Sequence, residues 1–225
     1  MAAGGGRHRA LAGHAARHAA RGDRRARGGG RGALHRLDRG VEGEEEQDYA
    51  RSLPLAEALR DEVVLAYEIN GVPLPPQHGL PLRLLVPDWY GMTSVKWLTR
   101  ITLLGAPFGG YQMSRAYRLR HAEDEAGVPL TRMRVRALMV HPGIPEFLTR
   151  ARVVRAGECV LEGRTWSGVA DVEGVEVSVD GGETWAEAEL GDASLGRFAW
   201  RPWRFVWHAT PANNGVQRVR VTVTP

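Results

Sequence analysis

The stretch AYEINGVPLPPQHGLPLRLLVPDWYGMTSVKWL, residues 66–98, decides how the first half of this chain folds. Asn70 and Gly71 form a turn dipeptide, and a proline-rich segment follows them. Proline fixes φ and removes a backbone donor, so this segment is expected to be a stiff loop and not a helix. Residues 82–86 and 95–103 are mostly apolar, and they predict two strands after the loop.

The same stretch carries three cationic side chains, His78, Arg83 and Lys96. His78 alone is typical of a turn residue, because it precedes a glycine between prolines. Arg83 interrupts an apolar strand, where a charge needs a partner. Lys96 is the only lysine in a chain that otherwise uses arginine, which hints at a site for a compact point charge. Together the three side chains suit an anion such as a phosphate.

Length and composition set outer limits. The 225 residues, 43% of them hydrophobic, are typical of one large or two ordinary domains with a real core. Residues 1–40 hold ten Arg and two acidic residues, so the remainder, with 20 basic and 24 acidic residues, is mildly acidic. The one cysteine, Cys159, excludes an internal disulfide and a CxxC metal site. Neither a run of 18 apolar residues nor a secretory signal is recognised, so we expect no membrane span and, by default, a cytoplasmic location.

Residues 1–33 consist almost entirely of Ala, Gly, Arg and His. Such a segment buries too little apolar surface to offset its ordering entropy, so we expect disorder, with order beginning near Leu34. A nucleic-acid-binding arm is one interpretation, because basic tails bind phosphate backbones. The lack of aromatic residues for base stacking disfavours it. A solvated tail and a GC-rich stretch translated in the wrong frame are the alternatives, and we favour the last.

Residues 34–132 form the first expected domain. The acidic run at residues 42–48 could be mistaken for a metal cluster, but consecutive carboxylates beside Gly are typical of a solvated surface loop. Pro54 predicts the first turn of a short helix over residues 55–60. Residues 63–66 predict a strand.

Residues 133–225 show a different sequence pattern, in which short segments of alternating apolar and polar residues are separated by turns. Residues 175–179 alternate Val with polar residues, and Asp180-Gly181-Gly182 then predicts a hairpin that returns at Trp185. Further strands are expected at residues 152–154, 159–162, 203–207 and 219–223. This pattern favours an immunoglobulin-like β-sandwich. Most of its five Trp residues are expected in the core, and others suit an interface.

Residues 66–98 closely resemble the molybdopterin domain of the sulfite oxidase family, and the similarity extends from about residue 37 to residue 130. From residue 133 to about residue 211 the chain resembles that family's dimerisation domain, including RALMVHPGIPEFLTR, TWSG and VEVSVDGGETW. The resemblance implies an α+β, mostly β fold, in which a partial sulfite-oxidase-type molybdopterin domain precedes the immunoglobulin-like sandwich.

The resemblance also implies roles for individual residues. The elements HG-x-P-x-R and SVKW would hold the pyranopterin and its phosphate, and Tyr49 would lie beside the molybdenum oxo group. The family oxidises sulfite to sulfate at a molybdenum centre, which the pterin dithiolene and one cysteine thiolate hold. The cofactor-binding residues implied here are His78, Arg83, Ser94, Val95 and Lys96.

The sequence departs from the family pattern at both ends. In the family, the cysteine thiolate that binds molybdenum comes from an earlier half of the domain. Residues 1–33 stand in the place of that half and contain no cysteine. The one cysteine of this chain, Cys159, falls in a predicted strand of the sandwich. No protein ligand to the metal is therefore assigned. The last strands also look shortened, without the loop that carries a substrate-side arginine in the family.

These features lead to a molybdenum-cofactor-dependent oxidoreductase of the sulfite oxidase type, truncated and inactive as this single chain. The alternative is a non-catalytic dimerisation or interaction module derived from that family. The expected partners are a second copy, bound through the C-terminal sandwich, and a small oxyanion substrate; neither a membrane nor a nucleic acid is expected.

Overall fold

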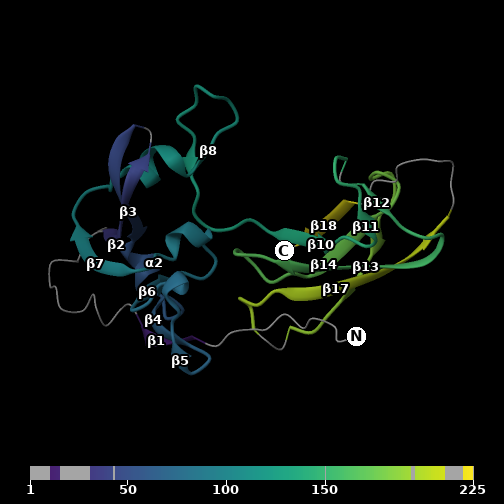
Figure 1. Cartoon of the computed structure of the whole chain (residues 1–225), viewed down its shortest axis with the longest axis horizontal. Coiled ribbons are helices and arrows are strands. Elements are labelled where there is room, and N and C mark those ends of the chain that lie inside the picture. The colour runs from purple at the N-terminus through teal and green to yellow at the C-terminus, as the bar shows by residue number, and fades with distance from the viewer. Residues whose placement is uncertain are drawn as a thin grey trace. The chain divides into compact units, whose positions relative to one another are not determined.

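A computed structural model describes residues 11–15, 31–42, 44–149, 151–193, 196–210 and 220–224. The chain divides into two compact units, residues 1–132 and 133–225 (Figure 1). Strands outnumber helices in the described parts of both units, which confirms the mostly-β fold. None of the helices in these ranges has the length and apolar character needed to cross a bilayer.

The first unit consists of short strands and single helical turns. Its strands are β1 (Leu11–Ala15), β2 (Arg31–Glu42), β3 (Glu45–Pro54), β4 (Val64–Ile69), β5 (Val72–Pro73), β6 (Arg83–Leu85), β7 (Leu98–Leu104), β8 (Arg118–Leu119) and β9 (Val128–Pro129). Its helices are α2 (Leu55–Ala58), the 3₁₀ turns η1 (Pro76–His78) and η2 (Gly91–Thr93), and the π-helical η3 (Gln112–Ala116).

Two antiparallel sheets organise this unit. One has the order β3-β2-β7, and Figure 1 shows these strands side by side. The other runs β1-β4-β5, and β6 also pairs with β4. The buried core includes Leu34 and Leu53 from the first sheet and Leu84 from the second, together with Val63 and Trp89. The sheets are therefore joined by one hydrophobic core.

The turns of residues 66–98 follow their residue types. Asn70 and Gly71 have φ values of 55° and 78° and connect β4 to β5 in a two-residue hairpin, which confirms the predicted turn. The proline-rich loop contains one 3₁₀ turn, η1, where no helical structure was expected. The strand predicted over residues 95–103 begins only at Leu98, because Trp97 has a φ of 48°, outside the extended region. The predicted helix over residues 55–60 ends at Ala58.

The acidic run at residues 42–48 is not a loop, so that expectation is wrong. Its residues lie at the tip of the β2–β3 hairpin, where Glu42 pairs with Glu45 and Val41 with Glu46. Hairpin pairing satisfies the backbone of both strands, and the charged side chains of Glu46 and Asp48 stay exposed to water. Among the described residues, no group of His, Cys, Asp or Glu side chains is placed to hold a metal ion.

The disorder expected over residues 1–33 is also wrong where this segment is described. Leu11–Ala15 forms β1, antiparallel to β4. Residues 31–33 belong to β2, where Ala33 is buried. Order thus begins before Leu34, because backbone pairing with a sheet edge can hold a segment that has few apolar side chains. Residues 1–10 and 16–30 lie outside the described ranges.

The second unit contains β10 (Arg136–Val140), β11 (Ile144–Pro145), β12 (Arg152–Val153), β13 (Gly157–Trp166), β14 (Gly174–Ser178), β15 (Ala186–Glu187), β16 (Glu189–Leu190), β17 (Arg201–Ala209) and β18 (Arg220–Thr224). These strands form a sheet of order β10-β13-β17-β16, a sheet of order β15-β14-β18, and the small β11–β12 hairpin. The immunoglobulin-like topology stays a prediction.

The core of the second unit takes side chains from both of its larger sheets. Leu161 of β13 and Trp203 of β17 pack with Val175 and Val177 of β14. Trp166 is buried as well, whereas Trp185 is 39% exposed and does not belong to the core. The alternation of Val with polar residues thus correctly identified the buried face of β14.

The predicted hairpin at residues 175–185 is confirmed, since β14 pairs with β15. Asp180 organises its turn by accepting hydrogen bonds from the Ser178 hydroxyl and from the N–H groups of Gly182, Glu183 and Thr184. Hydrogen bonds from Thr184 and Ser178 hold the pKa of Asp180 far below its usual value. The residue is therefore a turn-forming side chain.

Candidate functional site

The three predicted cationic positions lie around one glycine. Gly79 is buried and has a φ of 109°, a conformation that L-amino acids rarely adopt. A Cβ atom at this position would lie 3.1 Å from the Cβ of Arg83 and 3.1 Å from the Cβ of Lys96. The missing side chain therefore allows β6, the η1 turn and the segment before β7 to approach closely. We call His78, Gly79, Arg83 and Lys96 the cradle.

Three successive carbonyl groups of the η1 segment bind three side chains around the cradle. The Trp97 Nε1–H donates to the Pro76 carbonyl at 2.8 Å, and Lys96 Nζ donates to the Gln77 carbonyl at 2.9 Å. Arg83 Nη1 donates to the His78 carbonyl at 3.0 Å. These bonds satisfy the end of a short 3₁₀ turn and fix the two cations relative to the loop. The positive φ of Trp97 thus has a compensating hydrogen bond.

Arg83 has no carboxylate within ion-pairing distance among the described residues. Its other bond runs from Nη2 to the Ser94 carbonyl at 3.3 Å, and its buried Nε has no hydrogen-bond partner. Burial lowers the pKa of Arg83, although a guanidinium stays charged at neutral pH. A half-buried cation with an unused donor and no counter-charge is well suited to receive an anion.

Ser94 and Val95 complete the predicted set through different contacts. The Ser94 hydroxyl accepts a hydrogen bond from the Val86 N–H at 3.1 Å. The Val95 side chain is buried in the core, its N–H donates to Thr93, and its carbonyl accepts from the Leu84 N–H. Val95 therefore positions its neighbours Ser94 and Lys96, and its direct contact with a cofactor stays a prediction.

Tyr49 lies on β3 and is half-buried. Its hydroxyl donates a 2.6 Å hydrogen bond to the Met92 carbonyl, at the η2 turn. The guanidinium of Arg36 lies 4.3 Å from the centre of the Tyr49 ring and 4.8 Å from that of Trp97. Burial raises the pKa of Tyr49, so the hydroxyl is neutral at physiological pH. Arg36 thus connects the Tyr49 region to Trp97, which bonds to the cradle loop.

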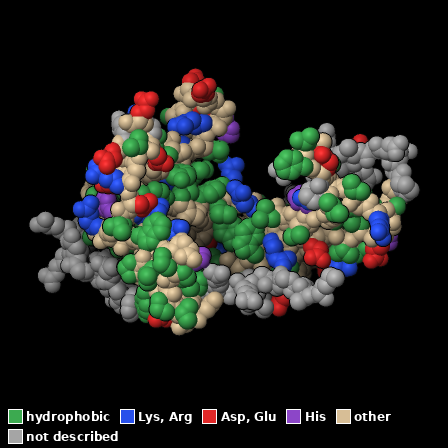
Figure 2. All heavy atoms as spheres, viewed as in Figure 1, with side chains coloured by type: hydrophobic (Ala, Val, Ile, Leu, Met, Phe, Trp, Pro, Cys, Tyr) green, Lys and Arg blue, Asp and Glu red, His purple; other side chains and the backbone are tan. Residues whose placement is uncertain are grey.

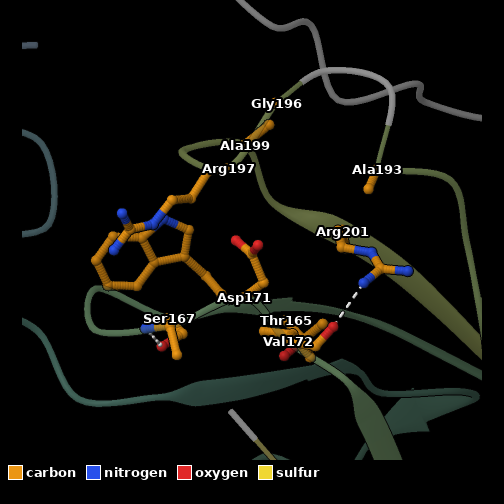
Figure 3. A pocket seen from close by; sticks show the side chains of 11 residues that line it. Thr165, Ser167, Asp171, Val172, Ala193, Gly196, Arg197, Ala199 and Arg201 are labelled. Atoms are coloured by element: carbon orange, nitrogen blue, oxygen red, sulfur yellow. Dashed lines mark hydrogen bonds between the residues drawn. The ribbon is translucent and has the colours of Figure 1, made fainter.

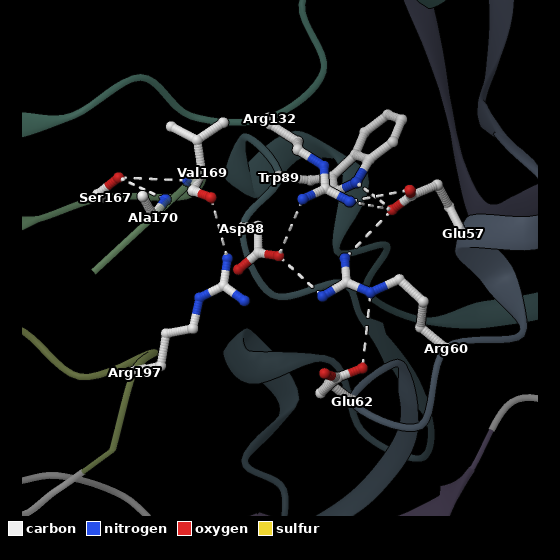
Figure 4. Close-up of polar contacts among 10 residues, drawn as sticks. All are labelled: Glu57, Arg60, Glu62, Asp88, Trp89, Arg132, Ser167, Val169, Ala170 and Arg197. Carbon is white, nitrogen blue, oxygen red and sulfur yellow. Dashed lines mark hydrogen bonds and ion pairs between the residues drawn. The ribbon is translucent and has the colours of Figure 1, made fainter. Parts of the chain in front are cut away.

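A second arginine cluster in the same unit has a different character. Figure 4 shows Glu57 accepting hydrogen bonds from Trp89, Arg60 and Arg132. Arg60 also bonds at 2.8 Å to the carboxylate of Asp88, whose side chain is fully buried. Burial alone would raise the pKa of Glu57, but the bonds from Arg132, Trp89 and Arg60 outweigh it and lower the pKa. This ion-paired network joins α2 to the chain around Asp88 and Arg132.

Comparison with known proteins gives these contacts a context. Residues 24–112 match the family described as the oxidoreductase molybdopterin binding domain. Mouse mitochondrial sulfite oxidase is 39% identical over 166 residues, which cover 71% of this chain and 30% of the mouse protein. Human mitochondrial sulfite oxidase is 33% identical over 184 residues, which cover 77% of this chain and 32% of the human protein.

The chain belongs to the sulfite oxidase family. It spans about a third of the length of the curated sulfite oxidases it matches. A barley nitrate reductase is also similar, with 31% identity over 142 residues that cover 57% of this chain and 16% of the reductase.

The fold has a solved counterpart. The sulfane dehydrogenase SoxCD of Paracoccus pantotrophus superposes with a TM-score of 0.70 at 22% identity, covering 88% of this chain and 46% of that chain. The family match begins at residue 24, inside the segment for which a wrong reading frame was favoured. That interpretation is therefore contradicted for residues 24–33.

A cavity of about 320 Å³ lies in the second unit. Polar side chains that line it form hydrogen bonds with backbone groups. Figure 3 shows Arg201 with its bond to the Val172 carbonyl, 2.6 Å long, and Arg201 also donates to the Gly191 carbonyl. The Ser167 hydroxyl accepts from the N–H groups of Val169 and Ala170. These contacts stabilise the loops around the cavity. The half-buried Arg83 of the first unit, whose Nε has no hydrogen-bond partner among the described residues, is therefore the stronger candidate for function.

The sequence analysis did not single out two arginines near Tyr49, Arg51 and Arg36. Arg51 is two residues after Tyr49 on β3, and the alternation of a strand could have placed both on one face. Arg36 had no signal in the sequence, because its role depends on the rings of Tyr49 and Trp97, which are far from it along the chain. Gly79 was noted only as part of a turn.

Proposed function

We propose that this chain binds the phosphate-bearing end of a molybdenum–pterin cofactor in the cradle and serves an oxidoreductase of the sulfite oxidase type. The observation that carries the proposal is the half-buried Arg83, which has an unpartnered Nε and no carboxylate within ion-pairing distance among the described residues. When bound, the cofactor supplies a two-electron redox centre capable of oxygen-atom transfer. Family membership supports a molybdenum cofactor as the anion.

The chemistry of the donors fits a phosphate. Arg83 offers a planar fork that matches two phosphate oxygens, and Lys96 offers a compact ammonium beside it. Both are already oriented by carbonyl groups of the η1 segment, so little side-chain entropy is lost on binding. The absence of a Cβ at Gly79 lets Arg83 and Lys96 lie close to the loop and to each other. His78 is the last residue of the η1 turn, directly before Gly79, and completes the set.

Tyr49 supplies a neutral hydroxyl to the same reaction. Its raised pKa keeps the proton on the oxygen, so the group carries no negative charge that would repel an anion. Its bond to the Met92 carbonyl fixes the ring in place. The substrate class that suits a neutral hydroxyl among arginines is a small oxyanion, and sulfite is the first to test.

The first unit contains no cysteine, and Cys159 lies in β13, where it packs against the core of the second unit. We therefore assign the cofactor's phosphate and pterin to the residues of the first unit, and not the metal. A chain of this composition is expected to hold pterin more firmly than molybdenum, because thiolate ligation normally contributes to metal affinity.

The decisive experiment measures pterin and molybdenum per chain after expression in a host that makes the cofactor. The wild-type chain is expected to carry pterin at a ratio near one, and Arg83→Met is expected to lower it at least about ten-fold, through loss of charge-assisted hydrogen bonds. Arg100→Met is the matched control, since Arg100 is an exposed arginine of the same unit. A wild-type ratio near zero would refute the proposal.

A second candidate role, self-association through the second unit, rests on the β11–β12 hairpin. Its apolar side chains are strongly exposed: Ile144 80%, Phe147 80%, Leu148 82% and Val153 75%. Figure 2 shows such hydrophobic side chains at the molecular surface. Clustered exposed apolar residues are typical of interfaces, so we propose a homodimer that uses this hairpin.

Sedimentation equilibrium of the metal-free chain tests this role. The wild type is expected to be a dimer, and Phe147→Ser with Leu148→Ser is expected to shift it to monomer. Val128→Ser is the control, because Val128 is a 61% exposed apolar residue of the other unit. A monomeric wild-type chain, or a dimer unaffected by the hairpin variant, would exclude this interface.

A further inference from the structure

The cavity of the second unit is bordered by charges of both signs. Asp171, Arg197 and Arg201 all line it, and Figure 3 shows the Asp171 carboxylate pointing into it with the two arginines on either side. Within the part of the chain that the structure describes, no ion pair involves any of the three. One cavity therefore holds an acidic group and two basic groups that do not neutralise one another.

The two arginines differ in how firmly they are held. The Arg201 guanidinium donates to the Val172 carbonyl at 2.6 Å and to the Gly191 carbonyl at 3.0 Å, so its position is fixed. Arg197 is exposed, and its hydrogen bond to a described residue is long, 3.4 Å from Nη2 to the Val169 carbonyl (Figure 4). A guanidinium has five N–H donors, so most of those of Arg197 are open to an acceptor. Arg201 thus shapes the wall, and Arg197 is the arginine that can bond to a ligand.

Asp171 lies in the loop between β13 and β14, directly before the buried Val172. Its carboxylate accepts no hydrogen bond from the described residues. Two other polar side chains of this unit organise their own loops: Ser167 accepts bonds from two N–H groups, and Asp180 accepts bonds from several. Asp171 does not have such a role in its loop, so its carboxylate is open to a donor from outside the chain.

The remaining wall of the cavity is apolar. Trp166 is 8% exposed, and its ring centre lies 6.2 Å from that of Trp200, with the planes tilted by 33°. Val172 belongs to the core of the unit, and Ala170 and Ala199 add small side chains. An indole ring packs well against apolar groups and also attracts cations over its face. The volume of about 320 Å³ lies at the lower end of the range of small-molecule sites, about 300–1,000 Å³.

We propose that this cavity binds a zwitterionic amino acid with an apolar side chain. The ammonium group of the ligand pairs with Asp171, its carboxylate pairs with Arg197, and its side chain packs on Trp166. A simple anion would lie beside the Asp171 carboxylate, and a simple cation would lie beside the arginines, so each would meet a like charge. A ligand that carries both charges is complementary to both, and this complementarity gives the site its specificity.

The inference does not depend on the cradle or on a molybdenum cofactor, because every residue that it uses belongs to the second unit. Isothermal titration calorimetry of the full chain with L-leucine tests it, beside two probes that each lack one charge. Isocaproate is leucine without the ammonium group, and isoamylamine is leucine without the carboxylate. Leucine is expected to bind in a saturable manner and at least about ten-fold more tightly than either probe.

Two substitutions assign the binding to the cavity. Asp171→Asn is expected to weaken leucine binding at least about ten-fold and to leave the binding of isocaproate undiminished, because isocaproate has no ammonium group. Arg197→Met is expected to weaken leucine binding similarly and to leave the binding of isoamylamine undiminished. Glu173→Gln and Arg155→Met remove exposed charges of the same unit outside the cavity, and both are expected to bind leucine like the wild type. Thermal unfolding of each variant verifies that it is folded.

Three results would overturn the inference. The first is the absence of saturable leucine binding to the wild-type chain. The second is leucine binding that neither cavity variant weakens, since the ligand would then lie elsewhere. The third is equal affinity for leucine and isocaproate, which would make the cavity an anion site. None of these results changes the pterin content of the chain, so the proposed function stands or falls separately.

Discussion

The first unit contains two kinds of buried or half-buried arginine. Arg60 and Arg132 are ion-paired with Glu57 and Asp88, one of which is fully buried. Arg83 and Arg51, by contrast, donate to backbone carbonyls, and each retains an Nε without a partner. Within one unit, some arginines are therefore fully ion-paired, whereas others keep a hydrogen-bond donor without an acceptor.

The difference separates stability from binding. A fully paired network satisfies its own charges, so removing one partner leaves another charge buried and destabilises the fold. A cation that lacks a counter-charge contributes less to the stability of the fold and more to the binding of an anion. Mutations in the ion-paired network should therefore lower the free energy of unfolding. Mutations of the arginines without a counter-charge should mainly weaken ligand binding.

The largest stability effect is expected at Asp88. Its side chain is completely buried and accepts the 2.8 Å bond from Arg60. Asp88→Asn keeps the shape and tolerates the φ of 75°, but it leaves Arg60 without its buried counter-charge. We expect a loss of about 3 kcal/mol in the free energy of unfolding, measured by denaturant titration. Asp124→Asn, at an exposed loop position, is the control and should change it little. Equal effects of the two variants would contradict the distinction drawn here.

The next effect is expected at Gly79, the closest approach within the cradle. Gly79→Ala introduces a Cβ 3.1 Å from both Arg83 and Lys96 at a φ of 109°. We expect a loss of about 2 kcal/mol in the free energy of unfolding, together with a fall in pterin content. Gly71→Ala is a matched control, because its φ is 78° and nothing lies within 4 Å of its Cβ position. If both variants lose stability equally and both keep pterin, crowding in the cradle has no functional consequence.

The smallest effect concerns pH. The pKa of Glu57 is lowered in the folded state, so its carboxylate stabilises the fold above its unfolded pKa of about 4.3. This contribution is lost as the pH falls through the lowered folded pKa. Glu57→Gln is expected to lower the free energy of unfolding by about 1 kcal/mol at pH 7 and to flatten its decline below pH 4.3. An identical pH profile in wild type and variant would show that the Glu57 bonds do not contribute.

Much of the fold could be predicted where local rules dominate. Asn70-Gly71 predicted its hairpin, and the alternation of Val175 and Val177 with polar residues predicted the buried face of β14, because turn geometry and side-chain alternation are short-range properties. The start of β7 was predicted too early, since the positive φ of Trp97 depends on its bond to Pro76, 21 positions away. The acidic run was misread because consecutive charges say nothing about backbone pairing.

The candidate site divides in the same way. The sequence determined that His78 precedes a glycine in a stiff loop and that Arg83 and Lys96 are basic residues of the predicted strands that follow, and the motif resemblance gave these residues an anionic cofactor. Only the tertiary structure decided which cations have counter-charges. Ion pairs and hydrogen bonds depend on distances between segments far apart in the sequence, such as the ion pair of Arg132 with Glu57 or the hydrogen bond of Arg51 to the Gln112 carbonyl. Composition fixes how many charges a chain carries, whereas folding decides which of them remain to bind something else.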